Sequence, residues 1–456
     1  MFKMTNRLIT VILIGLLGWA CSSEPTMNTT HISGQFSVAD SMDQSNDLSG
    51  IGFTVIKKDS ANANADTLFH QVTDSAGTFS GIVSFDESRQ YPALISRNNR
   101  NLGRVGVILA NGDSIDISAT LPNMRESLAI SSTEHDAMKV YNRLNKNFTR
   151  IRNLANSGYL QGDSLRQEVI KWSDLFWQVY ADNEGTIASE LAARDGISIL
   201  QGFDNEKMME RIRSVQDQDK FSDIGASVGK NYIAQTRGLM PALNYLDTLK
   251  QSTEENNKRM QISMERIKLL YDSARVDAAK QELEGFKEEF SPQIRPTEWV
   301  ESMSYDLNYM SPGDTIPEFS FTENGQTVSR DSLLGTPFIL EVTRLSNRLY
   351  QNQFDRTVAI HSIYKNYGLE VVTLPLDESQ ITVDAFFDER PKPWPVADAQ
   401  TFDRNQLLEK FNVRLIPTRF LIDREGKIIR KYVGQEYQDV INGIQTLIQN
   451  DKEPAS

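Results

Sequence analysis

The feature that most constrains this chain is its single cysteine, Cys21. Lys3 and Arg7 form a short basic start, and residues 8–17 are an apolar run that is too short to span a bilayer. Small residues then precede Cys21, which indicates a cleavage point in front of it. Residues 22–456 therefore contain no thiol, and any fold that they form has to work without one.

These features predict a lipoprotein signal peptide over residues 1–21, with Cys21 as the lipidated residue. Residues 22–30 are polar and rich in Ser and Thr, as expected for a tether between a lipid anchor and a folded domain. An uncleaved anchor helix and a soluble protein are the alternatives. A diacylglycerol thioether on Cys21 with an acylated amine would anchor the chain firmly, because two kinds of lipid chain hold far better than one.

Length and charge narrow the classes of partner. The chain has 456 residues, enough for about three domains, and 39% of them are hydrophobic, as in folded proteins. The formal net charge of −13 argues against nucleic acid and against anionic lipid headgroups as partners. The four histidines are scattered, and no Cys, His or acidic cluster has ligand spacing, so we expect no metal site and no cofactor.

Residues 31–122 alternate between apolar and polar in short segments, which predicts strands joined by polar loops. The stretch 72–81 reads as a strand, a tight turn at Gly77 and a second strand. This pattern resembles the Thr-Asp-x-x-Gly-x-Phe hairpin of carboxypeptidase-regulatory-like β-sandwich domains. The whole block is similar to the β domain of unknown function that precedes thioredoxin-like domains in Bacteroidota lipoproteins, and we expect a structural or interaction module.

Residues 123–310 change to helical periodicity. Apolar side chains recur on one face in each of two stretches, near Tyr141 and Phe148 and again near Trp172 and Phe176. The stretch 253–290 is long, charged and amphipathic. The pattern predicts a central helical domain, a hairpin or a small bundle, whose aromatic side chains pack in its core or line a ligand groove.

Residues 311–450 resemble thioredoxin-like domains of the TlpA and peroxiredoxin type, and residues 451–456 form a tail. The resemblance is carried by the opening 311–319, by the hairpin turn at Asn324 and Gly325, and above all by the segment 414–429, which matches the Ile-Pro-Thr loop, strand, Asp-x-x-Gly turn and strand of that family. We thus predict a multidomain α+β protein with an N-terminal β-sandwich, a central helical domain and a C-terminal thioredoxin-like α/β domain.

The resemblance places the two active cysteines of the family on Asn347 and Tyr350. Disulfide exchange requires a sulfur nucleophile, which neither residue supplies. In the peroxiredoxin register Ser346 falls on the cysteine, and it lacks an evident activating histidine. We therefore predict no catalytic residue in either register.

The resemblance also implies roles for residues around that position. Glu341 stands six residues before Asn347, where the family keeps a buried acid; without a thiol, a carboxylate that reaches solvent or an arginine is an equal expectation. Pro417 matches the cis-proline of the family, which presents the preceding backbone to a bound peptide. Tyr350, Ile416, Pro417 and Thr418 would then line a peptide-binding groove, although plain retention of the fold is an equal alternative.

Two functions remain open from the sequence. The first is a lipid-anchored envelope lipoprotein, in the outer membrane and facing the periplasm or the cell surface, whose redox-inactive thioredoxin-like domain binds a protein or peptide. The second is a thiol-disulfide oxidoreductase or redoxin that acts with the thiols of a partner. An accessory role in envelope assembly or nutrient uptake cannot be separated from the first. The oligomeric state is left open.

Overall fold

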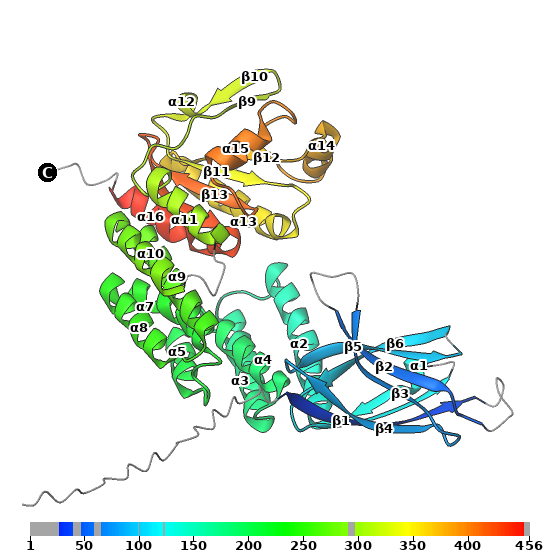
Figure 1. Cartoon of the computed structure of the whole chain (residues 1–456). Coiled ribbons are helices and arrows are strands. Elements are labelled where there is room, and N and C mark those ends of the chain that lie inside the picture. The colour runs from blue at the N-terminus through cyan, green and yellow to red at the C-terminus, as the bar shows by residue number, and fades with distance from the viewer. Residues whose placement is uncertain are drawn as a thin grey trace, which may run out of the picture. The chain divides into compact units, whose positions relative to one another are not determined.

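The computed structural model describes residues 27–39, 47–58, 65–98, 100–121, 124–290 and 297–450. The predicted signal peptide with Cys21, most of the tether and the tail 451–456 lie outside the described residues. The chain folds as two compact units that divide between Asp204 and Asn205 (Figure 1). The division falls inside the range 123–310 that the sequence indicates as one helical domain.

The first unit contains two four-stranded sheets, ordered β4-β1-β7-β8 and β3-β2-β5-β6. Strands β1 and β7 pair in parallel, whereas the other neighbours are antiparallel. Both sheets contribute to one apolar core that includes Phe36 of β1 and Phe53 of β2, so they form a sandwich. The elements are β1 (Asn28–Val38), β2 (Ile51–Lys58), β3 (Ala65–Val72), β4 (Thr78–Phe85), β5 (Arg89–Arg97), β6 (Arg100–Leu109), β7 (Ser114–Leu121), α1 (Met124–Ser127) and β8 (Ala129–Ser131).

The turn at Gly77 has the predicted local form but not the predicted connection. Gly77 adopts a φ of 77°, and the Asp74 carboxylate accepts hydrogen bonds from the backbone N–H groups of Ala76 and Thr78. However, β3 and β4 belong to different sheets, so the turn joins the two layers of the sandwich instead of closing a hairpin. The hairpin expectation was therefore wrong, because a local turn does not decide which sheet its second strand joins.

Three helices complete the first unit: α2 (Thr133–Asn156), α3 (Gly162–Asp182) and α4 (Ile187–Ser198). Their shared core buries Tyr141 and Phe176, with Phe148 partly buried beside them. The predicted aromatic periodicity therefore serves core packing. Helix α2 is joined to the sandwich at His135, whose Nε2 accepts a hydrogen bond of 3.1 Å from the backbone N–H of Ile108 in β6.

The second unit begins with a helical segment. The stretch 253–290 that is amphipathic in sequence forms two helices, which separate at Ala274, where φ is 56°. Tyr271 of the first of these helices donates to the Met310 carbonyl over 2.6 Å. The helices are α5 (Asn205–Ser214), α6 (Ser222–Ile224), α7 (Lys230–Arg237), α8 (Leu239–Ser252), α9 (Asn256–Asp272), α10 (Val276–Phe290) and α11 (Thr297–Tyr309), with a π-helical turn (Gly225–Gly229) before α7.

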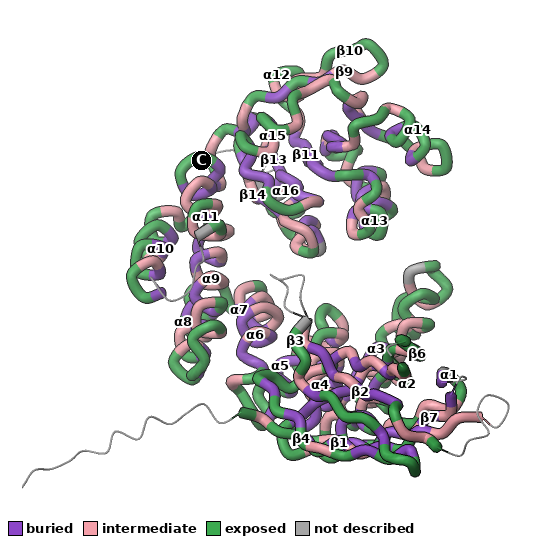
Figure 2. The backbone as a smooth tube through the Cα atoms, turned by 45° about the vertical axis from the view of Figure 1, so that its right-hand side comes forward, coloured by how far each residue is buried: buried purple, intermediate pink, exposed green. Residues whose placement is uncertain are grey.

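The rest of the second unit is the predicted thioredoxin-like α/β domain. Its sheet has the order β12-β11-β13-β14, in which β11 and β12 are parallel and the other pairs are antiparallel. Strand β11 is buried at every position (Figure 2). One apolar core lies on each face of the sheet. The elements are β11 (Phe338–Thr343), α13 (Arg348–Tyr364), β12 (Glu370–Pro375), α14 (Gln380–Asp388), α15 (Arg404–Lys410), β13 (Thr418–Ile422), β14 (Ile428–Val433) and α16 (Val440–Asn450).

A small hairpin precedes this sheet, as the sequence predicts. Strands β9 (Ser320–Glu323) and β10 (Gln326–Ser329) pair antiparallel, and α12 (Arg330–Leu333) follows them. Asn324 and Gly325 both have positive φ, 48° and 80°, which is the two-residue turn that an Asn-Gly pair favours. The predicted fold class, a sandwich, a helical region and a thioredoxin-like domain, is confirmed.

Candidate functional site

Asn347 stands at the start of α13, where the family places its first cysteine, and it acts as the N-cap of the helix. Its Oδ1 accepts a hydrogen bond of 3.0 Å from the backbone N–H of Tyr350. Its Nδ2 donates to the carbonyl of Ile416 over 3.3 Å. The side chain that replaces a thiol thus ties the helix start to the loop before Pro417.

Tyr350 does not lie on the surface. Its side chain is 0% exposed and packs against Phe354 and Phe386. Burial, followed by the nearby Glu341 carboxylate, raises the pKa of the Tyr350 hydroxyl well above its ordinary value of 10. The expectation that Tyr350 lines a groove is corrected by this burial, since its side chain belongs to the core beneath the α13 start.

Glu341 of β11 is fully buried and its carboxylate is saturated by protein donors. Oε1 accepts from Arg419 Nε over 2.6 Å, while Oε2 accepts from the hydroxyls of Thr373 over 2.8 Å and Tyr350 over 3.3 Å. The Thr373 hydroxyl in turn accepts from Trp394 Nε1 over 2.9 Å. Glu341 is thus buried, as the resemblance implies, and it pairs with an arginine; it does not reach solvent.

Arg419 is the residue of this network that sequence reasoning missed. It is 0% exposed, its Nη1 donates to Gln353 Oε1 over 2.8 Å, and its guanidinium lies 3.8 Å from the centre of the Tyr437 ring. A signal was present: Glu341 and Arg419 are each the one charged residue in an apolar strand, and the register of β11 and β13 places them directly opposite one another.

The loop before β13 brings together the other predicted groove residues. The Ile416–Pro417 peptide bond is cis, as the resemblance implies. Thr418 is buried and its hydroxyl donates to the Leu415 carbonyl over 2.6 Å, while Ile416 is half-buried. The side chain of Leu415 is 67% exposed, so it is the apolar group that this loop presents at the surface.

A cavity of about 730 Å³ lies beside this loop, inside the second unit. One side of it is formed by the helical segment and the other by the thioredoxin-like domain. Sequence reasoning did not find it, because its two sides are separated by more than 100 residues. Its lining comprises Lys268, Tyr271, Glu298, Trp299, Glu301, Ser302, Met303, Asp306, Asn412, Arg414, Leu415, Thr418, Lys431, Val433 and Glu436.

Two ion pairs, one buried and one half-buried, hold the two sides of the cavity together. Lys431 of β14 donates to both carboxylate oxygens of Asp306 in α11, at 2.9 and 2.8 Å, and to the Asn412 carbonyl. Lys268 of α9 pairs with Glu436 over 3.3 Å. Burial lowers the pKa of Lys431, whereas the carboxylates of Asp272 and Glu436 outweigh burial at Lys268 and raise its pKa.

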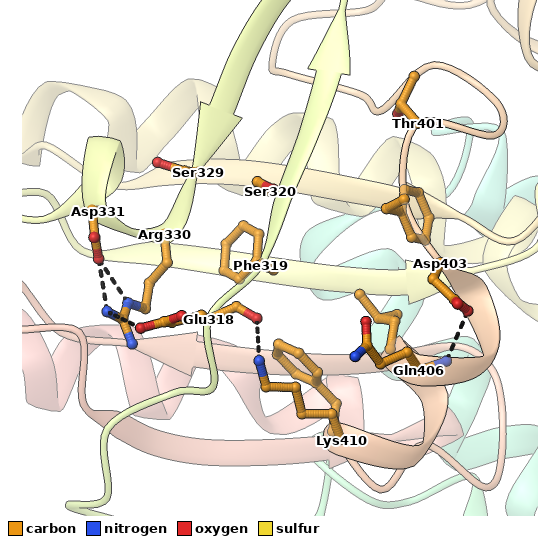
Figure 3. Close-up of a pocket in the computed structure, with 13 residues that line it drawn as sticks. Glu318, Phe319, Ser320, Ser329, Arg330, Asp331, Thr401, Asp403, Gln406 and Lys410 are labelled. Atoms are coloured by element: carbon orange, nitrogen blue, oxygen red, sulfur yellow. Dashed lines mark hydrogen bonds and ion pairs between the residues drawn. The ribbon is translucent and has the colours of Figure 1, made fainter.

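A second cavity, of about 450 Å³, lies between the β9–β10 hairpin and α15 (Figure 3). Both of its basic side chains already have a hydrogen-bond partner. Arg330 donates to the Asp331 carboxylate at 2.8 Å, and Lys410 donates to the Glu318 carbonyl over 2.9 Å.

Among the described residues, no group of three or more His, Cys, Asp or Glu side chains is placed to hold a metal ion. Within the same part of the chain, no helix is both long enough and apolar enough to cross a membrane.

Comparison with known proteins agrees with the thioredoxin-like topology. The chain is 26% identical over 140 residues to thiol-disulfide oxidoreductase ResA of Bacillus cereus, which is 30% of this chain and 79% of that protein. It is 27% identical over 140 residues to ResA of Bacillus subtilis, 30% of this chain and 76% of that protein. About 30% of this chain is therefore homologous to thioredoxin-fold thiol-disulfide oxidoreductases. No model of a known protein family matches the chain.

Solved structures similar to this chain include two thioredoxin-family domains. The thioredoxin domain of a thiol-disulfide oxidoreductase from Bacteroides vulgatus is 18% identical, covers 30% of this chain and 98% of its own, and has a TM-score of 0.28. A thiol:disulfide interchange protein from Chlorobium tepidum is 21% identical, covers 30% of this chain and 97% of its own, and has a TM-score of 0.27.

Proposed function

We propose that this chain is a lipid-anchored envelope lipoprotein whose thioredoxin-like domain binds a protein or peptide and carries out no thiol chemistry of its own. The observation that carries this proposal is the structural role of Asn347 and Tyr350, which stand at the two cysteine positions of the family. Asn347 caps α13 and bonds to the Ile416 carbonyl, and Tyr350 fills the core. Both residues serve the structure of the site.

The chemistry of the remaining groups supports the absence of thiol exchange. Residues 22–456 supply no sulfur nucleophile of the kind that a mixed disulfide requires. The Tyr350 hydroxyl is buried with a raised pKa, so it stays protonated and cannot replace a thiolate. Glu341, the residue at the position of the family acid, has both carboxylate oxygens bonded to protein donors.

The surface beside the former active site supports a binding role. Leu415 is exposed, and the cavity beside the loop is large enough for several side chains. Proteins that keep a fold without its chemistry can use the old substrate surface for binding. Anchoring through Cys21, in the outer membrane and facing the periplasm or the cell surface, rests on the sequence of residues 1–30.

An insulin-reduction assay tests the redox part of the proposal. The full-length chain in detergent should reduce insulin no faster than the dithiothreitol in the assay does alone. Because dithiothreitol supplies thiols from outside, the same assay covers the alternative in which the chain acts with the thiols of a partner. Acceleration above the dithiothreitol rate would overturn the proposal and favour that alternative.

Capture in the native envelope tests the binding part. A photo-crosslinking amino acid in place of Leu415 should capture one defined protein, whereas the same amino acid in place of Tyr159, which is 84% exposed in the first unit, should not. Leu415 is the right position because Tyr350 is buried and inaccessible to a partner. Identical products from both positions would contradict a binding surface at this loop.

A further inference from the structure

Helix α11 is fixed against the loop that carries Leu415. Asn412 Nδ2 donates to the Ser302 carbonyl and to Asp306 Oδ1, both over 2.8 Å, and the Tyr305 hydroxyl donates to the Lys410 carbonyl over 3.1 Å. These contacts hold the helix beside the segment 412–418, so the cavity has a defined wall on the helical side.

The charges deep in the cavity are already paired. Lys431 is bonded to Asp306, and Lys268 is paired with Glu436. The Lys431–Asp306 pair is buried and offers little to a ligand, since breaking it would leave a buried charge without a partner, while Lys268 and Glu436 already bind one another. The groups available to a ligand therefore lie nearer the surface.

Those available groups are predominantly acidic. Glu298 and Glu301 lie three residues apart on α11, both are exposed, and neither makes an ion pair or hydrogen bond with another described side chain. Arg414, the exposed cation of the lining, donates its Nε to Asn412 Oδ1 over 3.0 Å. Two carboxylates that have no partner among the described side chains, beside one engaged guanidinium, favour a cationic group on the ligand.

Apolar side chains lie next to these carboxylates. Trp299 is half-buried on α11, Met303 lies one turn further along the same helix, and Leu415 is exposed on the opposite side of the cavity. Such a set removes an apolar side chain of the ligand from water, which would supply most of the binding free energy.

The backbone of the loop favours a polypeptide as the ligand. The N–H groups of Arg414, Leu415 and Ile416 have no hydrogen-bond partner among the described residues. A run of unpaired backbone donors beside apolar and charged side chains is the arrangement that an extended peptide completes.

We propose that this cavity binds an extended segment of a partner protein in which a Lys or Arg side chain lies next to a large apolar side chain. Glu298 and Glu301 receive the cation, and Trp299, Met303 and Leu415 receive the apolar side chain. The inference rests on the proposed binding function and adds the chemistry of the partner and the part played by α11.

The test uses the full-length chain in detergent and three fluorescein-labelled nonapeptides, with Gly-Ser flanks and the central triplets Leu-Lys-Leu, Leu-Glu-Leu and Ser-Lys-Ser. Fluorescence anisotropy should show the tightest binding for Leu-Lys-Leu. The double variant E298Q/E301Q should weaken that binding roughly fivefold, as the loss of two partly exposed ion pairs predicts. The variant L415S should weaken it as well.

The variant E425Q is the matched control, because Glu425 is exposed but does not line this cavity; it should bind Leu-Lys-Leu as the original chain does. Equal affinities for Leu-Lys-Leu and Leu-Glu-Leu, or no effect of E298Q/E301Q, would overturn the cation preference while leaving a peptide-binding function in place. Failure of all three peptides to bind would overturn the inference, and capture at Leu415 would then decide separately whether the proposed function survives.

Discussion

At the scale of single residues, Glu341, which stands where the family keeps a buried acid, forms a buried ion pair with Arg419. Glu341 and Arg419 are both 0% exposed, and their side chains meet over 2.6 Å. Moving two charges out of water costs several kcal/mol each, which must be offset by the mutual attraction, by the hydrogen bond that Thr373 donates to Glu341 and by the one that Gln353 accepts from Arg419. The pair therefore fixes how these side chains are arranged more than it adds to net stability.

This view predicts an asymmetric response to substitution. R419M alone should destabilise the second unit by about 3–5 kcal/mol, because it leaves the Glu341 carboxylate buried without its cation. The double variant E341L/R419M should recover most of that loss, since no buried charge remains. Urea unfolding of the two variants and of the original chain measures both effects.

The control for this prediction is R404M, which removes a cation whose partner Glu378 has a side chain that is 82% exposed. It should change the free energy of unfolding by less than about 1 kcal/mol. If R419M were as stable as R404M, the Glu341 carboxylate would not depend on Arg419 as its buried partner.

At the scale of elements, the start of α13 depends on the Asn347 side chain, which makes two hydrogen bonds. Asn347 Oδ1 caps the helix and Nδ2 holds the Ile416 carbonyl. N347A should lose both bonds and cost about 1 kcal/mol, typical of a lost N-cap. N347D should keep the cap, since a carboxylate accepts from the Tyr350 N–H and suits a helix N-terminus, but it cannot donate to Ile416.

Hydrogen exchange separates the two roles. In N347D the Tyr350 amide should keep its protection, whereas the amide of Gly434, which donates to the Pro417 carbonyl over 2.8 Å, should exchange faster as the loop loosens. In N347A both amides should exchange faster. Unchanged exchange at Gly434 in N347D would show that the bond to Ile416 does not hold the loop.

The same scale shows what could be predicted from the sequence. The match of 414–429 to the loop, strand, turn and strand of the family predicted β13 and β14, and the Asn-Gly pair predicted the β9–β10 turn, because these signals are local. The position of β4 in the sheet opposite to β3 and the burial of Tyr350 were not predictable, since each depends on which distant residues pack against the segment. The cavity beside Leu415 needs α11, more than 100 residues earlier, and so left no local signal.

At the scale of the whole molecule, helices divide between two units instead of forming a domain of their own. Helices α2–α4 belong to the unit that contains the sandwich, and α5–α11 to the unit that contains the thioredoxin-like sheet. A helix with one apolar face must bury it against a neighbour, and periodicity alone does not say which neighbour that is. Because the two units bury different residues, we expect the free energy of unfolding of each unit to depend on pH in its own way.

His135 makes the stability of the first unit depend on pH. Its Nε2 accepts from the Ile108 N–H, so the ring is neutral and its Nδ1 proton points to the Ser132 hydroxyl at 2.9 Å. Burial, partly opposed by the Asp113 carboxylate, lowers the pKa of His135 below its ordinary value of 6.5. In the unfolded chain this histidine binds a proton at a higher pH than in the folded unit, so the unfolded state gains protons first as the pH falls.

The stability contributed by His135 should therefore be fully present above about pH 6.5 and be lost progressively as the pH falls from there towards the lowered pKa of the folded state. Protection of the Ile108 amide in β6, corrected for intrinsic exchange, should fall over that range more steeply than protection in β11 of the second unit. H135Q should flatten this slope because it removes the titrating ring, whereas H31Q, at an exposed position, should leave it unchanged. A slope that survives in H135Q would assign the pH response of the first unit to its other titratable groups, which are its carboxylates and its two other histidines.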